Sequence, residues 1–197
     1  LDSANYALEL GAPIAVESDC AEDFTNGHRV PNWSHTVMHY RARGKKVPMK
    51  LHWYTGGKRP EDKSLTLTSN GSCLLIVGDK HTLQADIRSR ATRIITMNNA
   101  EWLEFKRNRP PETIPRVKGG HYKEWIDAIK GVGPTPGANF AETGPFTEAL
   151  MLAALSERRG AGKRIEWDSG NLRVTNDDTL NEYVNPSARK GFDCGRS

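Results

Sequence analysis

The sequence has few cysteines and no long apolar run. Its three cysteines, Cys20, Cys73 and Cys194, are far apart and odd in number, so they match neither a disulfide framework nor a paired zinc spacing. The longest apolar candidate, residues 146–155, is shorter than the ~18–20 residues of a membrane helix. We therefore expect a soluble chain without metal bound through cysteine pairs.

Several catalytic and phosphate-binding motifs are also missing. No strand is followed by G-x-G-x-x-G, and the nearest approach to a phosphate loop, G-A-G-K at residues 160–163, follows a helical pattern and lacks the Ser or Thr. Neither G-x-S-x-G nor H-E-x-x-H occurs. These absences argue against a dinucleotide fold, a serine-hydrolase elbow and a helical zinc site within the chain.

The charge balance is mildly basic, with 28 Lys and Arg against 24 Asp and Glu and a net charge of +4. The basic residues form small groups that acidic residues interrupt, so no single basic stripe for nucleic acid emerges. A length of 197 residues with 37% hydrophobic residues fits one compact domain, and we expect a single domain over residues 1–197.

The pattern of apolar residues predicts strands first and helices afterwards. Residues 1–11 resemble the end of a helix, and period-two alternation then predicts about six strands between residues 14 and 97. From residue 98 the period becomes helical, with helices expected over residues 121–130, 144–159 and 177–184. This order predicts an α+β fold, a mostly antiparallel open sheet with helices covering one face. We expect the other face, with Trp33, Leu74 or Ile76 on it, to be apolar enough for a homo-oligomer to pack sheet to sheet.

The densest polar and aromatic segment is W-Y-T-G-G-K-R-P at residues 53–60. Trp53 and Tyr54 end a predicted strand, and Lys58 and Arg59 follow a Gly-Gly turn, a composition that suits a polyol with an acidic group. The alternative is an ordinary hairpin with exposed cations. His121 and Glu124, three residues apart at the start of a helix, form a second candidate, for which a surface location is the alternative.

The histidines suggest a third possibility. His35 and His39 share one face of a predicted strand, and His52 lies on the next strand. Together with Glu17 or Asp19 they have the ligand types of a Zn²⁺ or Fe²⁺ site. If Met49, Leu51 and Trp53 face the core, however, His52 points away from it, and hydrogen-bonded or solvated histidines are the alternative.

The order of the segments resembles the C-terminal domain of Gfo/Idh/MocA-type NAD(P)-dependent oxidoreductases, in particular a planctomycete-like branch. The resemblance covers nearly the whole chain, and the ordered set is more specific than any one segment. The segments are Leu1 and Asp2, Y-A-L-E-L-G-A-P at 6–13, K-L-H-W-Y-T-G-G-K-R-P at 50–60, G-D-K at 78–80, G-H-Y-K-E-W-I-D-A-I at 120–129, N-F at 139–140, G-P-F-T-E-A at 144–149, K-R-I-E-W-D at 163–168 and R-K-G-F at 189–192.

The resemblance implies a substrate-binding and oligomerisation domain for a sugar or polyol, in a cytoplasmic or exported bacterial protein. It implies that NAD or NADP binds a separate N-terminal Rossmann domain, which these residues lack, and that the catalytic lysine and histidine lie upstream of residue 1. Asp2 matches the acidic residue that follows that histidine and would support it, unless it is a simple surface aspartate. We expect the turn at residues 53–59 to line the substrate pocket, with His121 and Glu124 close by, and no cofactor or metal to bind this chain alone.

Two alternatives to this function stay open. One is a non-catalytic carbohydrate-binding or assembly module, which an upstream G-x-G-x-x-G unit in the same reading frame would argue against. The other is a metal-dependent sugar isomerase or hydrolase that uses His35, His39 and His52.

Overall fold

The computed structural model describes residues 2–21, 30–62, 73–86, 88, 91–114 and 116–192. Cys194 and Ile87, the latter expected in a strand, lie outside them. The chain forms two compact units, each described by itself: the first contains Leu1–Leu8 and Lys63–Glu142, and the second contains Glu9–Asp62 and Thr143–Ser197. Among the described residues, no helix combines the length and the apolar character needed to cross a membrane.

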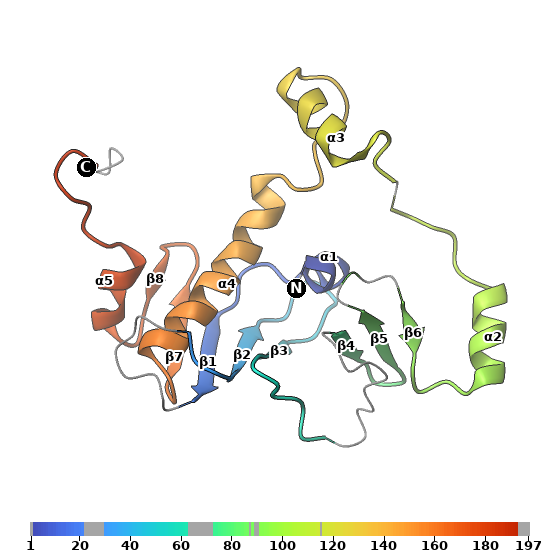
Figure 1. Ribbon diagram of the computed structural model, residues 1–197, viewed down its shortest axis with the longest axis horizontal. Coiled ribbons are helices and arrows are strands. Elements are labelled where there is room, and N and C mark those ends of the chain that lie inside the picture. The colour runs from blue at the N-terminus through green and yellow to red at the C-terminus, as the bar shows by residue number, and fades with distance from the viewer. Residues whose placement is uncertain are drawn as a thin grey trace. The chain divides into compact units, whose positions relative to one another are not determined.

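The second unit contains a five-stranded sheet in the order β3-β2-β1-β7-β8, and every neighbouring pair is antiparallel (Figure 1). Antiparallel neighbours were expected from the short, polar connections between the predicted strands. The strands are β1 (Ala15–Cys20), β2 (Ser34–Tyr40), β3 (Met49–Tyr54), β7 (Arg164–Asp168) and β8 (Arg173–Val174).

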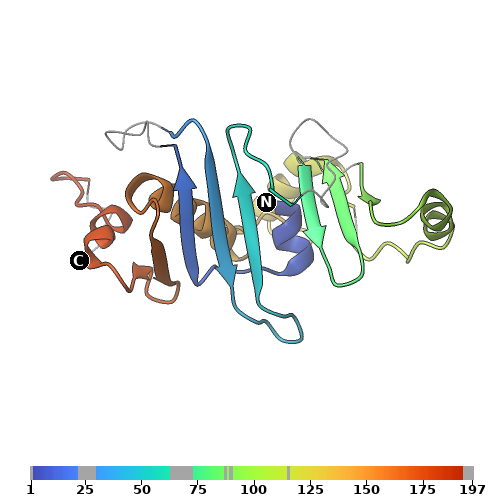
Figure 2. The same ribbon diagram turned by 90° about the horizontal axis from the view of Figure 1, so that it is seen from below.

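Helix α4 (Phe140–Arg159) covers one face of this sheet and lies behind the strands in Figure 2. Strand β2 alternates strictly between buried and half-buried residues because successive side chains point to opposite faces. The face toward α4, here called the covered face, holds most of the core of this unit. Its buried residues are Val16, Ser18, Ser34, Thr36, Met38, Tyr40, Ile165 and Trp167.

The opposite face, here called the open face, is polar and aromatic. Strand register places thirteen side chains on it, namely Ala15, Glu17, Asp19, His35, Val37, His39, Lys50, His52, Tyr54, Arg164, Glu166, Asp168 and Arg173. The expectation of an apolar open face is therefore wrong for this sheet. Leu74 and Ile76 lie instead on β4, in the first unit, where both are half-buried.

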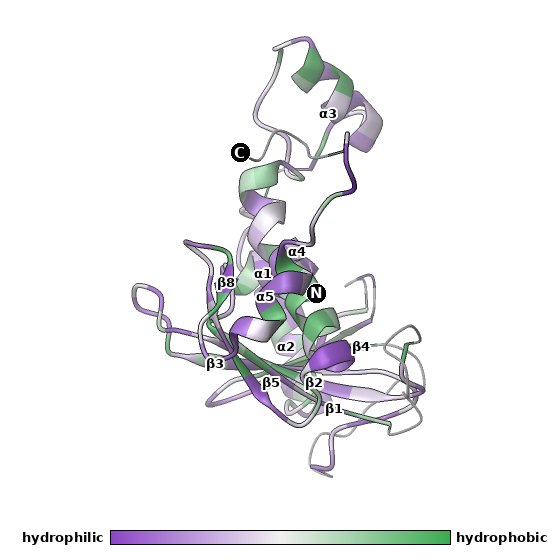
Figure 3. Ribbon diagram, turned by 90° about the vertical axis from the view of Figure 1, so that its left-hand side faces the viewer, coloured by the Kyte–Doolittle hydropathy of each residue, from purple (hydrophilic) through white to green (hydrophobic). Residues whose placement is uncertain are grey.

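The first unit contains a three-stranded antiparallel sheet of β4 (Cys73–Val77), β5 (Thr82–Asp86) and β6 (Arg93–Ile94). Its helices are α1 (Asp2–Leu8), α2 (Asn99–Arg107) and α3 (Gly120–Ile129). Asn98 caps α2, since its side chain accepts hydrogen bonds from the backbone while Glu101 bonds back to the Asn98 N–H. Figure 3 shows hydrophobic and hydrophilic segments alternating along α3, as the sequence pattern predicts.

Two predicted helices differ from the observed ones. The helix expected at residue 144 begins at Phe140, because the Asn139 side chain accepts from the backbone N–H groups of Ala141 and Glu142 and caps the first turn. The helix expected over residues 177–184 is a 3₁₀ turn, Asp178–Leu180, followed by α5 (Asn181–Val184). The α+β class with antiparallel strands and a helix-covered face is confirmed, with the strands divided between two sheets.

Candidate functional site

The turn after β3 is closely packed against the residues that precede β2. Gly56 and Gly57 adopt the left-handed conformation, with φ of 62° and 84°, which favours glycine. A Cβ on Gly56 would lie 1.9 Å from the Asn32 carbonyl oxygen, so the backbones touch there. The left-handed conformation explains glycine at both positions, and the close approach of the backbones is a second reason for glycine at position 56. The turn is consequently fixed to the start of β2.

This packing brings Lys58 to Trp33. The ammonium nitrogen of Lys58 lies 3.9 Å from the centroid of the Trp33 ring, in the range of a cation–π interaction. Trp33 is half-buried, whereas Lys58 and the following Arg59 are exposed. An aromatic ring and a cation thus meet at this turn, but the ring is that of Trp33, which is not among the predicted site residues. The backbone pairing of Ser34 with Thr55 places Trp33 next to the turn, so predicting that pairing would have identified Trp33 as a site residue.

The two aromatic residues that end β3 lie on opposite faces of the sheet. Trp53 is opposite Thr36, on the covered face, while Tyr54 is opposite His35, on the open face. The Tyr54 and His35 rings stack with centroids 4.3 Å apart and planes 3° apart. The two aromatic residues of the segment at residues 53–59 therefore lie on different faces, Trp53 on the covered face and Tyr54 on the open face.

A network of hydroxyl groups connects the turn to α4 through the covered face. The Ser34 and Thr36 hydroxyls both donate to Oε1 of Glu157, at 2.7 and 3.1 Å. The Ser34 hydroxyl also lies 2.8 Å from that of Thr55, the first residue after β3. Paired hydroxyls satisfy a half-buried carboxylate that would otherwise be costly to desolvate. Sequence reasoning missed this network, although Ser18, Ser34 and Thr36 stand at core-facing positions of the period-two pattern.

The other candidate residues belong to the first unit. On α3, His121 is exposed and Glu124 is half-buried; Glu124 Oε1 accepts from the Gly137 N–H at 3.1 Å, and the His121 ring centroid lies 4.2 Å from that of Tyr122. Asp2 is exposed at the start of α1. The proximity of His121 and Glu124 to the turn, and the supporting role of Asp2, stay predictions.

The open face groups the histidines. His35 Nε2 lies 3.0 Å from His52 Nδ1, within hydrogen-bond distance, and the His52 ring is parallel to that of Tyr54 within 15°. Burial and then the charge of His35 lower the pKa of His52, while burial and Glu61 raise the pKa of Tyr54. The lowered pKa favours the neutral form of His52.

The metal hypothesis finds no support in this geometry. His39 Nε2 lies 2.8 Å from Glu17 Oε1, so it forms a pair separate from that of His35 and His52. Within the described part of the chain, no three His, Cys, Asp or Glu side chains are arranged to hold a metal ion. The His35, His39 and His52 arrangement with Glu17 or Asp19 therefore stands as two hydrogen-bonded pairs.

The expectation that no nicotinamide dinucleotide binds this chain alone stays a prediction. Both described sheets are antiparallel, whereas a Rossmann fold binds the pyrophosphate at the turn of a parallel strand–helix–strand unit. Comparison with family models, curated proteins and solved structures found no match. The resemblance to Gfo/Idh/MocA C-terminal domains stays a prediction carried by the ordered sequence segments.

Proposed function

We propose that this chain is the substrate-binding and oligomerisation domain of an NAD(P)-dependent oxidoreductase that acts on a sugar or polyol. The observation that supports it most is the Lys58–Trp33 pair on the Gly56–Gly57 turn. The ordered segments that resemble the Gfo/Idh/MocA family give the proposal its reaction class. The nicotinamide chemistry belongs outside the residues described here, so this chain's contribution is to bind and orient substrate.

The chemistry of the turn suits a polyol with an acidic group. Aromatic rings present an apolar surface to the C–H groups of a sugar, and Lys58 and Arg59 supply donors and positive charge. A cation paired with a carboxylate contributes roughly 1.5–3 kcal/mol, against about 1 for a neutral hydrogen bond. Because Lys58 rests on Trp33, it is already ordered at the turn. We therefore expect an acidic sugar to bind better than a neutral one.

Calorimetric titration of the 197-residue chain with D-glucuronate and D-glucose tests this proposal. The expected result is tighter binding of D-glucuronate, weakened about tenfold in Lys58→Ala or Arg59→Ala, with unchanged thermal midpoints. Lys45→Ala is the matched control, since Lys45 is an exposed lysine of the same unit outside the turn. Equal affinities of both turn variants and the wild type for D-glucuronate would contradict the assignment of the site.

Self-association is the second part of the proposal. The polar open face limits the apolar area available for a sheet-to-sheet contact, so its charged and aromatic side chains would have to pair across the interface. Light scattering over a series of concentrations is expected to show a species larger than one chain. A monomer throughout the series would remove oligomerisation from the proposed function.

The competing function is a non-catalytic carbohydrate-binding module, with which the antiparallel topology of both described sheets is equally compatible. Under either function, titration with NADH followed by its fluorescence is expected to show no saturable binding to this chain. Saturable micromolar binding would contradict both. A G-x-G-x-x-G unit encoded upstream in the same reading frame would favour the oxidoreductase, and its absence the module.

A further inference from the structure

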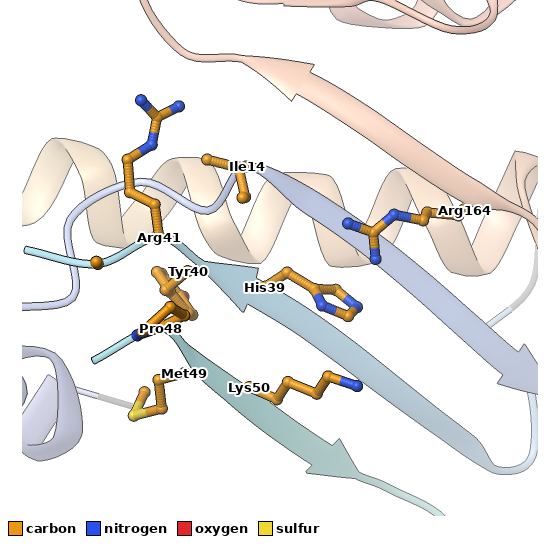
Figure 4. Close-up of a pocket in the computed structure, with 9 residues that line it drawn as sticks. Ile14, His39, Tyr40, Arg41, Pro48, Met49, Lys50 and Arg164 are labelled. Carbon is orange, nitrogen blue, oxygen red and sulfur yellow. The ribbon is translucent and has the colours of Figure 1, made fainter.

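A pocket of about 410 Å³ opens at one end of the β1–β2–β3 region, within the second unit. Its size falls within the range of small-molecule sites. Figure 4 shows the side chains of His39, Lys50 and Arg164 on the side of the sheet away from α4, so they belong to the open face. The lining residues are Ile14, His39, Tyr40, Arg41, Ala42, Pro48, Met49, Lys50 and Arg164.

The charged side chains of the lining are all basic. Lys50 and Arg41 form no ion pair among the described residues, and Arg164 uses only Nε to bond Glu166 Oε1, at 2.6 Å. The Nη donors of Arg164 therefore remain for a ligand, in the planar arrangement that binds a carboxylate through two hydrogen bonds. Burial is the largest cause of the lowered pKa of His52 nearby; His35, Lys50 and His39 lower this pKa further, and Glu17 raises it.

The strand register places Lys50 and His39 in one row across the sheet and Arg164 two residues away from that row on β7. Lys50 is directly opposite His39, and Arg164 is opposite Glu17, which is the partner of His39. Ala15 lies beside His39 on β1 and has no side chain long enough to fill the space between His39 and β7. In Figure 4 the Arg164 guanidinium points toward His39. The two nearby carboxylates are already engaged, Glu17 by His39 and Glu166 by Arg164.

Apolar groups complete the pocket next to this row. Ile14 and Pro48 line it without offering a charge or a side-chain hydrogen-bond donor, and Met49, which is opposite Tyr40 of the covered face, lies at the end of the pocket. Such a combination binds an amphipathic ligand, with the charge fixing its orientation and the apolar part supplying buried area. We propose that this pocket binds a small organic carboxylic acid, with the carboxylate bound among Lys50, His39 and Arg164 and the apolar body packed against Ile14 and Pro48.

The test is an NMR titration of the isotope-labelled 197-residue chain with benzoate, acetate and benzyl alcohol. Acetate keeps the charge of benzoate without the ring, while benzyl alcohol keeps the ring without the charge. We expect saturable shifts at residues 39–42 and 48–50, with benzoate binding about tenfold tighter than either analogue. Inorganic phosphate is added as a fourth probe, and phosphate that binds as tightly as benzoate would replace the organic acid by a general anion and overturn the proposal.

Variants of Lys50 test whether its positive charge binds the carboxylate of benzoate. Lys50→Gln is expected to weaken benzoate binding about tenfold, while Lys50→Arg retains it. Lys45→Gln is the matched control, since it removes the same charge from an exposed position that does not line the pocket. Equal losses in Lys50→Gln and Lys45→Gln, absence of saturable shifts, or equal binding of benzyl alcohol would overturn the proposal.

The inference is separable from the proposed function. Lys58→Ala is expected to leave benzoate binding unchanged, because Lys58 does not line this pocket. Lys50→Gln is expected to leave D-glucuronate binding unchanged for the corresponding reason. Loss of one binding event with retention of the other therefore shows which of the two assignments has failed.

Discussion

The covered and open faces of the five-stranded sheet are built from the same strands but differ in burial and in the side-chain interactions that they form. On β2, Thr36 and Met38 are fully buried beneath α4, while His35 and His39 on the other face are only half-buried. The covered face uses hydroxyls that pair with one another and with Glu157, and the open face uses rings and charges. One residue along the strand therefore separates a fully buried side chain from one that is partly exposed to solvent.

The largest effect should come from the covered face. Met38→Ala removes a side chain with no exposed surface and is expected to lower the free energy of unfolding by about 2–5 kcal/mol. Val37→Ala, at the next position on the open face, should cost under about 1 kcal/mol. Urea denaturation of both variants, followed by circular dichroism, measures the difference. Similar costs would contradict the assignment of the two faces.

A smaller effect is expected at the polar link between the covered face and α4. Glu157→Ala leaves the Ser34 and Thr36 hydroxyls without their shared acceptor, so the free energy of unfolding should fall by about 1–3 kcal/mol. Arg158→Ala, the exposed neighbour on α4, is the control and should change stability by less than about 0.5 kcal/mol. If the two variants unfold at the same urea concentration, the network does not stabilise the turn.

Ser156 offers a change of opposite sign on the same helix. Its Oγ is buried and has no hydrogen-bond partner among the described residues. Ser156→Ala removes a desolvated hydroxyl and should raise the free energy of unfolding by up to about 1 kcal/mol. Ser18→Ala should lower it by about the same amount, because that hydroxyl lies 2.8 Å from the Thr36 hydroxyl. Thermal midpoints that both fall would show that Ser156 is satisfied in solution.

The smallest effect concerns the open face and is a pH dependence. Since folding lowers the pKa of His52 from its ordinary 6.5, the unfolded chain binds that proton more readily, and stability falls as the pH drops below 6.5. His52→Gln should reduce the difference in thermal midpoint between about pH 5 and about pH 7.5 by on the order of 1–2 °C, because solvent screens an exposed group. His121→Gln, an exposed histidine on α3, is the control. An unchanged difference in His52→Gln would contradict the interpretation.

The alternation of residues allowed much of this fold to be predicted. The strand positions of His35, Val37 and His39, and the opposite orientation of His52 and Trp53, follow directly from a period of two. The character of the open face could not be predicted in the same way, because assigning Leu74 and Ile76 to it required knowing that β4 pairs in a separate sheet. Strand partners depend on long-range packing, which local periodicity does not encode.

The sequence allowed the residues of the turn to be predicted, but not the distant residues that contact them. The Gly56–Gly57 turn with Lys58 could be located from the sequence, because glycine pairs favour left-handed turns. Trp33, the aromatic partner of Lys58, lies 25 positions before Lys58 in the sequence. The pairing of Ser34 with Thr55 brings Trp33 next to the turn. The pocket at Lys50 and Arg164 likewise depends on the pairing of β7 with β1, which no local sequence pattern predicts.

The most direct test of the central claim is to map where a sugar acid binds. We predict that D-glucuronate added to the isotope-labelled chain shifts the amide signals of Gly56, Gly57 and Lys58 and the indole signal of Trp33, and that Lys58→Ala abolishes these shifts without lowering the thermal midpoint. Shifts confined to other residues, or the same shifts in Lys58→Ala as in the wild type, would contradict the account.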